Sequence, residues 1–282
     1  MIDTKGTLDA YSLDTTATIF GTLPGYTPQT IPANAGGGGV VVAQNQFVYA
    51  IFPEAGIQEL FGWSKAKSGD LALMNGFPIP LLSLSSITQF TYNQQVLLTN
   101  PAGTLLFISE FADSQILEFQ IASNGALTPA PGSPLNTQLA GLQPQNMAMD
   151  GQGKYLYVME DSISHTGQFV VGYSITPGTG QLIQIPGNWG NSIPIWEMVG
   201  DPDGLYMIGI TGKVFSQVGS NDTNLYVYKI DTVVNPGALS PVVGPPASPF
   251  PTKFAPFNIA MQPTSTGGEY VYSFSLDDLG TA

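Results

Sequence analysis

Carboxylates recur at one position of a repeating pattern and are the most conspicuous candidates for chemistry. Glu54, Glu110, and Glu160 with Asp161 each come just past the second predicted strand of a repeat. If their side chains converge, the oxygens could bind Ca²⁺ or another divalent cation. Such an ion would polarise a carbonyl group or lower the pKa of water. The alternative is that these carboxylates cap turns or stay solvated.

The single histidine is the other candidate for proton transfer. His165 is the only side chain whose ordinary pKa lies near neutrality. It falls within residues 160–167, which we expect to form an extended loop before the third strand of a repeat. Ser162 and Ser164 are near in sequence, but neither lies in a nucleophile-elbow pattern. The candidate catalytic residues are therefore His165, Glu160 and Glu110, with a simply exposed histidine as the alternative.

One tryptophan and several amides are candidates for ligand contact. Trp196 could stack on a sugar or another flat ligand, although packing in the core is the commoner use of such a ring. Side-chain amides that could line the same region are Gln145, Asn146 and Asn258.

The overall charge excludes several classes of partner. Only 10% of the 282 residues are charged, arginine is absent, and the net charge is −13. Such a surface repels phosphate backbones, so nucleic-acid binding is excluded. No apolar run is long enough for a membrane helix. There is also no cysteine, and hence no disulfide framework.

The polar residues favour an exported protein. Ser, Thr, Asn, Gln and Gly supply most of the polarity, which we associate with an extracellular, periplasmic or cell-surface location. Residues 2–8 have neither the basic start nor the long apolar middle of a signal peptide. We therefore expect that this chain is a mature or trimmed form, rather than a cytosolic protein.

Three similar segments define an internal repeat, at residues 100–109, 150–159 and 201–209. Their turn glycines are Gly103, Gly153 and Gly204, so the steps are fifty and fifty-one residues. In each, Asn or Asp opens a tight turn, glycine supplies a positive φ, and a short apolar strand follows. A strand is also expected before each turn, at 95–99, 146–149 and 196–199. These pairs predict one hairpin per repeat.

A second hairpin follows in each repeat. Its first strand is predicted at 116–121, 169–175 and 224–230, and each unit closes in a proline-rich exit. A less regular copy covers residues 40–78. Four strands per repeat predict an all-β fold, a β-propeller of four-stranded antiparallel blades. A β-sandwich is the alternative, but it gives no reason for the fifty-residue register.

The whole chain is predicted to be one propeller domain. Its blade units are expected at 27–80, 84–135, 139–190 and 192–250, with a composite blade formed by 251–282 and 6–24. The chain's end resembles a first and second strand, and its start a third and fourth, so joining them would remove two exposed sheet edges. This gives about five blades' worth of sequence. The alternative is a fragment of a longer propeller.

The segments 100–109, 150–159 and 125–134 resemble the lactonase-type β-propeller family. This family comprises 6-phosphogluconolactonase-like proteins, carboxymuconate-lactonizing enzymes and YVTN surface-repeat proteins. The resemblance implies seven blades, so this chain would be truncated or form a smaller ring. It also implies His and Arg near the channel, at the start of the innermost strands. The matching stretches here are 143–146, 194–197 and 255–258, and they contain neither residue.

Three functions remain open. The first is a secreted or cell-surface module that binds a small-molecule, carbohydrate or protein ligand at the channel face. The second is a lactone hydrolase or isomerase for a neutral or weakly charged substrate, with help from a cation. The third is carbohydrate recognition through Trp196. The sequence does not decide whether the protein is an enzyme, because one fold hosts many functions.

Overall fold

The structure is a computed structural model, and the part of the chain that it describes falls into separate ranges. These are residues 7–8, 11–14, 19–22, 29–30, 39–54, 57–81, 97–110, 113–137, 142–162, 168–186, 195–211, 222–243, 248–252, 256, 258–263 and 269–274. The chain divides into two compact units. Unit 1 comprises Met1–Ile108 with Phe119–Thr128, and unit 2 comprises Ser109–Glu118 with Pro129–Ala282.

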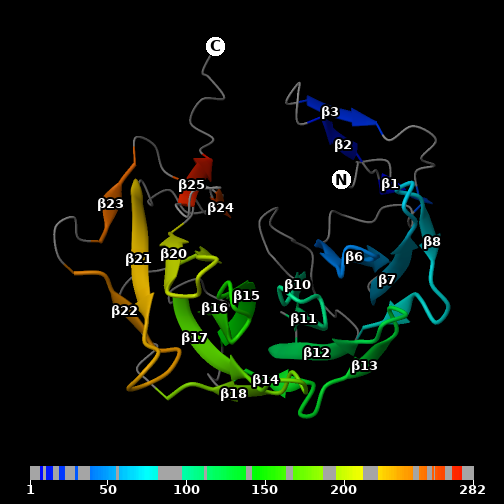
Figure 1. The fold of residues 1–282 in the computed structure, drawn as a ribbon. Helices are drawn as coiled ribbons and strands as arrows, with labels where there is room; N and C mark the ends of the chain where they lie inside the picture. The colour runs from blue at the N-terminus through cyan, green and yellow to red at the C-terminus, as the bar shows by residue number, and fades with distance from the viewer. Residues whose placement is uncertain are drawn as a thin grey trace. The chain divides into compact units, whose positions relative to one another are not determined.

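The regular structure of the described ranges consists of β-strands (Figure 1). The strands are β1 (Thr7–Leu8), β2 (Tyr11–Asp14), β3 (Ile19–Thr22), β4 (Gln29–Thr30), β5 (Val40–Ala43), β6 (Phe47–Glu54), β7 (Ile57–Lys65), β8 (Leu71–Leu73), β9 (Ile79–Pro80), β10 (Leu97–Thr99), β11 (Leu105–Glu110), β12 (Gln115–Ile121), β13 (Leu127–Pro129), β14 (Leu135–Asn136), β15 (Leu142–Met149), β16 (Tyr155–Ser162), β17 (Gln168–Ile175), β18 (Leu182–Gln184), β19 (Glu197–Gly200), β20 (Tyr206–Ile210), β21 (Asn224–Ile230), β22 (Leu239–Pro241), β23 (Phe250–Pro251), β24 (Asn258–Pro263) and β25 (Glu269–Phe274). Within these ranges, no helix is long and apolar enough to cross a bilayer.

Four larger sheets repeat one strand order. Each begins with four consecutive strands side by side: β5 to β8, β10 to β13, β15 to β18, and β19 to β22. Successive strands of these sheets pair antiparallel, as β10 does with β11, β16 with β17, β20 with β21, and β6 with β7. The smaller pairs are β1 with β4, β2 with β3, and β24 with β25. The all-β prediction and the four-stranded antiparallel unit are confirmed.

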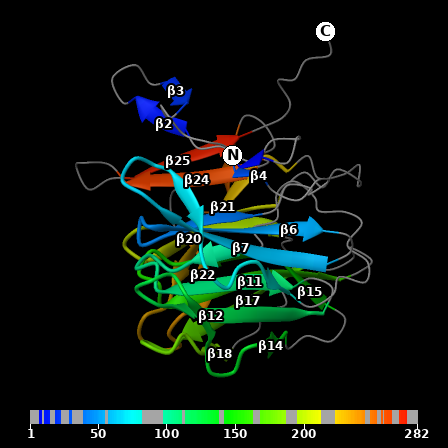
Figure 2. The ribbon, with the colours of Figure 1, turned by 90° about the vertical axis from the view of Figure 1, so that its right-hand side faces the viewer.

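Within unit 2, successive sheets meet along their innermost strands. Strand β19 is in contact with β15 on one side and with β24 on the other. Figure 2 shows β24 and β25 as the hairpin that follows the sheet containing β20 and β21. In unit 1, β5 and β10 are neighbours in the same way. First strands adjoining first strands are what blades of a β-propeller require. The pairing of the two chain ends into one composite blade stays a prediction.

The predicted turn chemistry opens the inner hairpin of three blades. The Oδ1 atom of Asp150 accepts hydrogen bonds from the backbone N–H groups of Lys154 (2.7 Å) and Tyr155 (2.6 Å). Gly153, between Asp150 and Lys154, has a φ of 69°, a conformation that costs glycine little. Asn100 and Asp201 accept the equivalent pairs of bonds. This repeated turn is the physical basis of the fifty-residue register.

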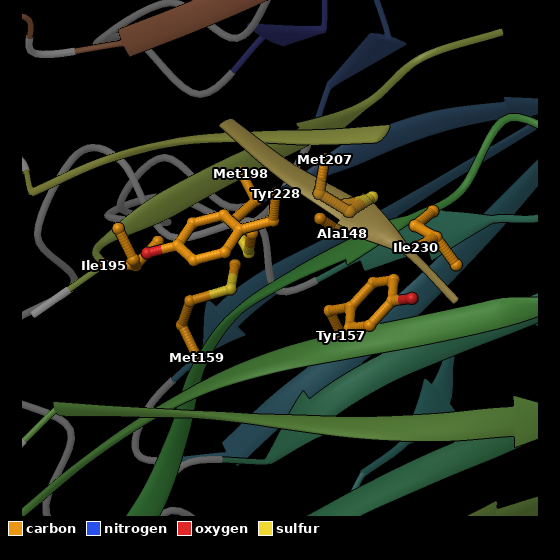
Figure 3. Close-up of a cluster of buried hydrophobic side chains, with 8 residues drawn as sticks. All are labelled: Ala148, Tyr157, Met159, Ile195, Met198, Met207, Tyr228 and Ile230. Atoms are coloured by element: carbon orange, nitrogen blue, oxygen red, sulfur yellow. The ribbon is translucent and has the colours of Figure 1, made fainter. Parts of the chain in front are cut away.

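Apolar side chains and two buried tyrosines join the last two complete sheets of unit 2. The cluster in Figure 3 contains Ala148, Tyr157, Met159, Ile195, Met198, Met207, Tyr228 and Ile230. The Tyr157 hydroxyl donates to the carbonyl of Gly237, at 2.9 Å, in the outer turn of the next sheet. In unit 1, the Tyr49 hydroxyl donates in the same way to Gly125, at 2.7 Å. A tyrosine on a second strand thus reaches the next outer turn in both units.

Two strands extend beyond their predicted limits. Strand β15 starts at Leu142, four residues before the predicted 146–149 strand. Strand β16 continues to Ser162, so the prediction that residues 160–167 are wholly a loop is wrong at its start. The hairpin continues because Glu160 pairs with Phe169 and Asp161 with Gln168 on β17. The candidate carboxylates therefore lie within the second strands and not past them: Glu54 ends β6 and Glu110 ends β11.

The proline-rich exits form short strands that the sequence pattern did not predict. Strands β9, β14 and β23 each pair back onto the third strand of their own sheet. At two of these exits, the serine before the proline forms a hydrogen bond with the third strand. Ser133 Oγ accepts a hydrogen bond from the N–H of Glu118, and Ser248 Oγ accepts one from the N–H of Val227. Strands β7, β12 and β21 are therefore each flanked by two short strands in succession on the outer side.

Candidate functional site

Two buried glutamates occupy the same position in successive blades. Glu110 follows Gly103 by seven residues, and Glu160 follows Gly153 by the same distance. Glu110 is 0% exposed and Glu160 is 1% exposed. Among the described residues, none donates a hydrogen bond to any of their four carboxyl oxygens. A buried polar group without a partner is uncommon and calls for a functional or solvent explanation.

Burial shifts the titration of both glutamates toward neutrality. Removal from water disfavours the carboxylate and raises the pKa of Glu160 from 4.5 to about 7. The pKa of Glu110 also rises to about 7, mainly through burial and further through the nearby charge of Asp113. Near neutral pH, such a group exists in both protonation states and can both take and give a proton.

A third buried carboxyl and a tyrosine lie in unit 2 on faces that meet. The carboxyl of Glu118 accepts a hydrogen bond from the backbone N–H of Leu182 in β18, and burial raises its pKa to about 7. The hydroxyl of Tyr173 on β17 is buried and has no partner among the described residues. Burial raises the pKa of Tyr173, and the charges of Glu160 and Glu118 raise it further. The sequence reasoning missed Glu118, although it interrupts the apolar pattern of strand β12.

A fourth buried glutamate lies on an innermost strand. Glu197 is 2% exposed, and its carboxyl accepts a hydrogen bond from the N–H of Ile259 on β24. Burial raises its pKa to about 7. The bond connects the innermost strands of two successive sheets, which gives Glu197 an evident structural use. Glu197 falls in the stretch 194–197, at the predicted start of an innermost strand, but was not itself a predicted site residue.

The predicted ligand-contact residues are mostly buried. Trp196 is 7% exposed, and its backbone carbonyl accepts a bond of 2.7 Å from Asn146 Nδ2 on the preceding innermost strand. Gln145 is buried and Asn258 is half-buried. Asn146 therefore connects neighbouring strands, and the indole of Trp196 is largely covered. Ligand contact by these four residues stays a prediction.

Comparisons by sequence find no family model and no curated protein that matches the chain. Comparison of structures finds a proposed 6-phosphogluconolactonase from Bacteroides uniformis, at 19% identity and a TM-score of 0.65, over 98% of this chain and 72% of that one. It also finds the periplasmic gluconolactonase of Pseudomonas aeruginosa, at 14% identity and a TM-score of 0.56, over 91% and 67% of the two chains. The fold is that of the lactonase-type β-propellers.

A similar fold also occurs in a protein named for other chemistry. Hydrazine synthase of Kuenenia stuttgartiensis matches at 12% identity and a TM-score of 0.51, over 96% of this chain and 71% of that one. At such identities the likeness is one of fold. The resemblance that the repeats carry is therefore confirmed as architecture, while the chemistry of this lactonase-type propeller depends on its own side chains.

The predicted cation site is only partly covered by the described residues. Glu110 and Glu160 belong to different sheets, and the side chains of Glu54 and Asp161 lie outside the described residues, as does all of His165. Within the described part of the chain, no three His, Asp or Glu side chains are grouped to hold a metal ion. The four-carboxylate site and the catalytic histidine stay predictions.

Proposed function

We propose that this protein hydrolyses uncharged sugar lactones. The fold it shares with the proposed 6-phosphogluconolactonase and the periplasmic gluconolactonase favours this function over a non-catalytic binding module. The observation that carries the proposal is Glu160, a buried carboxyl without a partner among the described residues and with a pKa of about 7. A group of that kind suits general acid–base work at neutral pH.

Charge selects the substrate class. The chain has twenty carboxylate side chains and seven lysines. It has no arginine that could bind a phosphate or carboxylate through two parallel hydrogen bonds. A phosphorylated lactone would meet net repulsion over most of this surface. An uncharged lactone would meet none. We therefore assign neutral aldonolactones, not sugar phosphates, as substrates.

The proposed chemistry is a balanced addition of water. The Glu160 carboxylate takes a proton as the oxygen of water bonds to the lactone carbonyl carbon. The bond between that carbon and the ring oxygen then breaks, and the proton passes to the leaving oxygen. The products are a hydroxy acid, which ionises, and a proton released to solvent. His165, five residues further along the chain, is the second candidate base.

The test is proton release from glucono-1,5-lactone and 6-phosphogluconolactone, corrected for spontaneous hydrolysis. We expect turnover of the neutral lactone, and a kcat lowered about 10²- to 10⁴-fold in Glu160→Gln, the range typical of a lost acid–base group. His165→Ala measures the second candidate. The matched control is Asp203→Asn, an exposed turn carboxylate, which should leave kcat unchanged. No acceleration of any neutral lactone by the wild type would refute the proposal.

A binding module is the alternative function, and a second experiment distinguishes it from hydrolysis. Its support is the absence of arginine and the presence of one histidine in the whole chain. Titration calorimetry with a sugar lactam, a stable analogue of the lactone, separates the two functions. Lactam binding without turnover of the lactone would assign a binding role.

A further inference from the structure

Three polar side chains of unit 2 are ordered along strand β17: Glu160 is on the neighbouring strand β16, Tyr173 is on β17 itself, and Glu118 is bonded to β18. Tyr173 is paired with Leu156, and Glu160 follows Leu156 by four residues on the same strand. Because side chains of a strand alternate between faces, Glu160 and Tyr173 are on the same face of this sheet. Leu182, whose N–H binds Glu118, is paired with Ile175, two residues beyond Tyr173. Tyr173 therefore lies between the positions of Glu160 and Glu118.

The opposite face of this space comes from strands β11 and β12. The N–H of Ile121 donates to the carbonyl of Thr104, which sets the register of this hairpin and places Glu118 opposite Phe107. Ser109, two residues from Phe107, is therefore on the same face as Glu118. Ser109 is 3% exposed, and its hydroxyl has no partner among the described residues.

The polar atoms in this space are deeply buried and have no hydrogen-bond partner among the described residues. They are Ser109 Oγ, Glu118 Oε2, both carboxyl oxygens of Glu160, and the hydroxyl of Tyr173. Each exposed fraction is 3% or less. Five such atoms without partners would cost free energy comparable with the whole stability of a folded domain, unless water links them. Buried water makes about three hydrogen bonds, typically to polar groups of this kind.

We infer that Tyr173 is a positioning residue for Glu160, to which its hydroxyl donates a hydrogen bond through ordered water in this buried space. Glu118, fixed by Leu182, anchors the far end of the water chain. This inference rests on the proposed function for its catalytic meaning. The hydrogen bond favours the ionised form of Glu160, the form that must accept a proton from the attacking water.

The test follows the ionisation of Glu160 directly. Protein labelled with ¹³C at the glutamate carboxyls is titrated by NMR, and Glu160→Gln identifies the signal of Glu160. In Tyr173→Phe, we expect the midpoint of Glu160 to rise by about one pH unit, the size of one lost hydrogen bond to the charged form. The ring keeps its packing, because the removed hydroxyl has no protein partner among the described residues.

The matched control is Tyr157→Phe. Tyr157 is equally buried in the same sheet, but its hydroxyl donates to Gly237 and its side chain alternates to the other face. An unchanged Glu160 midpoint in Tyr173→Phe, or an equal shift in both variants, overturns the inference. A shift confined to Tyr173→Phe in a protein that turns over no lactone supports the inference and refutes only the proposed function. With turnover, the pH profile of kcat/KM should shift by the same amount.

Discussion

At the scale of single residues, four glutamates of the described ranges are buried. Glu110, Glu118, Glu160 and Glu197 are each 2% exposed or less, and burial raises the pKa of each to about 7. Glu118 and Glu197 accept one backbone N–H each, whereas Glu110 and Glu160 accept none from the described residues. A backbone N–H favours the ionised carboxylate in Glu118 and Glu197. No described group does so for Glu110 and Glu160, which are therefore better suited to exchange protons.

These shifts predict that stability falls as pH rises. A carboxyl with a pKa of 4.5 unfolded and about 7 folded binds more protons in the folded state between those values. Its contribution is complete below pH 4.5 and is lost by about pH 7, at a cost of roughly 3 kcal/mol per fully buried group. Urea unfolding at pH 5 and pH 8 measures the loss. Glu118→Gln should reduce this difference by about 2 kcal/mol, and an equal or larger difference would contradict the assignment.

At the scale of elements, a tyrosine on a second strand ties one sheet to the outer turn of the next. In unit 2 it is Tyr157 with Gly237, and in unit 1 it is Tyr49 with Gly125. Both glycines have positive φ and are crowded, since a Cβ on Gly237 would come within 2.4 Å of Ile185 Cδ1. The close turn and the long phenol therefore fit each other, and a side chain at the glycine would separate them.

Removal of this bond should destabilise the protein without change of fold. Tyr157→Phe leaves the carbonyl of Gly237 without its tyrosine donor, and we expect a loss of about 1–2 kcal/mol in the free energy of unfolding. Tyr206→Phe, at a position 37% exposed, is the control and should change stability by less than about 0.5 kcal/mol. Equal losses of unfolding free energy in the two variants would mean that the hydrogen bond from Tyr157 to Gly237 does not stabilise the fold.

At the scale of the whole molecule, we expect net charge, and not the fold, to set the choice of substrate in the proposed reaction. The chain carries −13 and no arginine, while its fold is shared with proteins named for a phosphorylated and for an unphosphorylated sugar lactone. Long-range repulsion acts before any side chain contacts the substrate, and it therefore appears in kcat/KM.

Ionic strength tests this effect. Because the screening length shortens from about 30 Å at 0.01 M salt to about 8 Å at 0.15 M, added salt should weaken the repulsion of an anionic lactone. We expect kcat/KM for 6-phosphogluconolactone to rise several-fold over that range and kcat/KM for glucono-1,5-lactone to stay constant. A parallel rise for both substrates would indicate a salt effect on the protein and not on encounter.

The blades could be predicted from the sequence because their signals are local. Asn100, Asp150 and Asp201 cap turns through backbone groups four and five residues away, and the strands beside them are short and apolar. Only the tertiary structure decided which carboxylates are buried, that Glu160 lies within a strand, and that Glu118 and Tyr173 share its surroundings. Burial of one polar side chain depends on a neighbouring sheet some fifty residues away in sequence, and no local pattern records that contact.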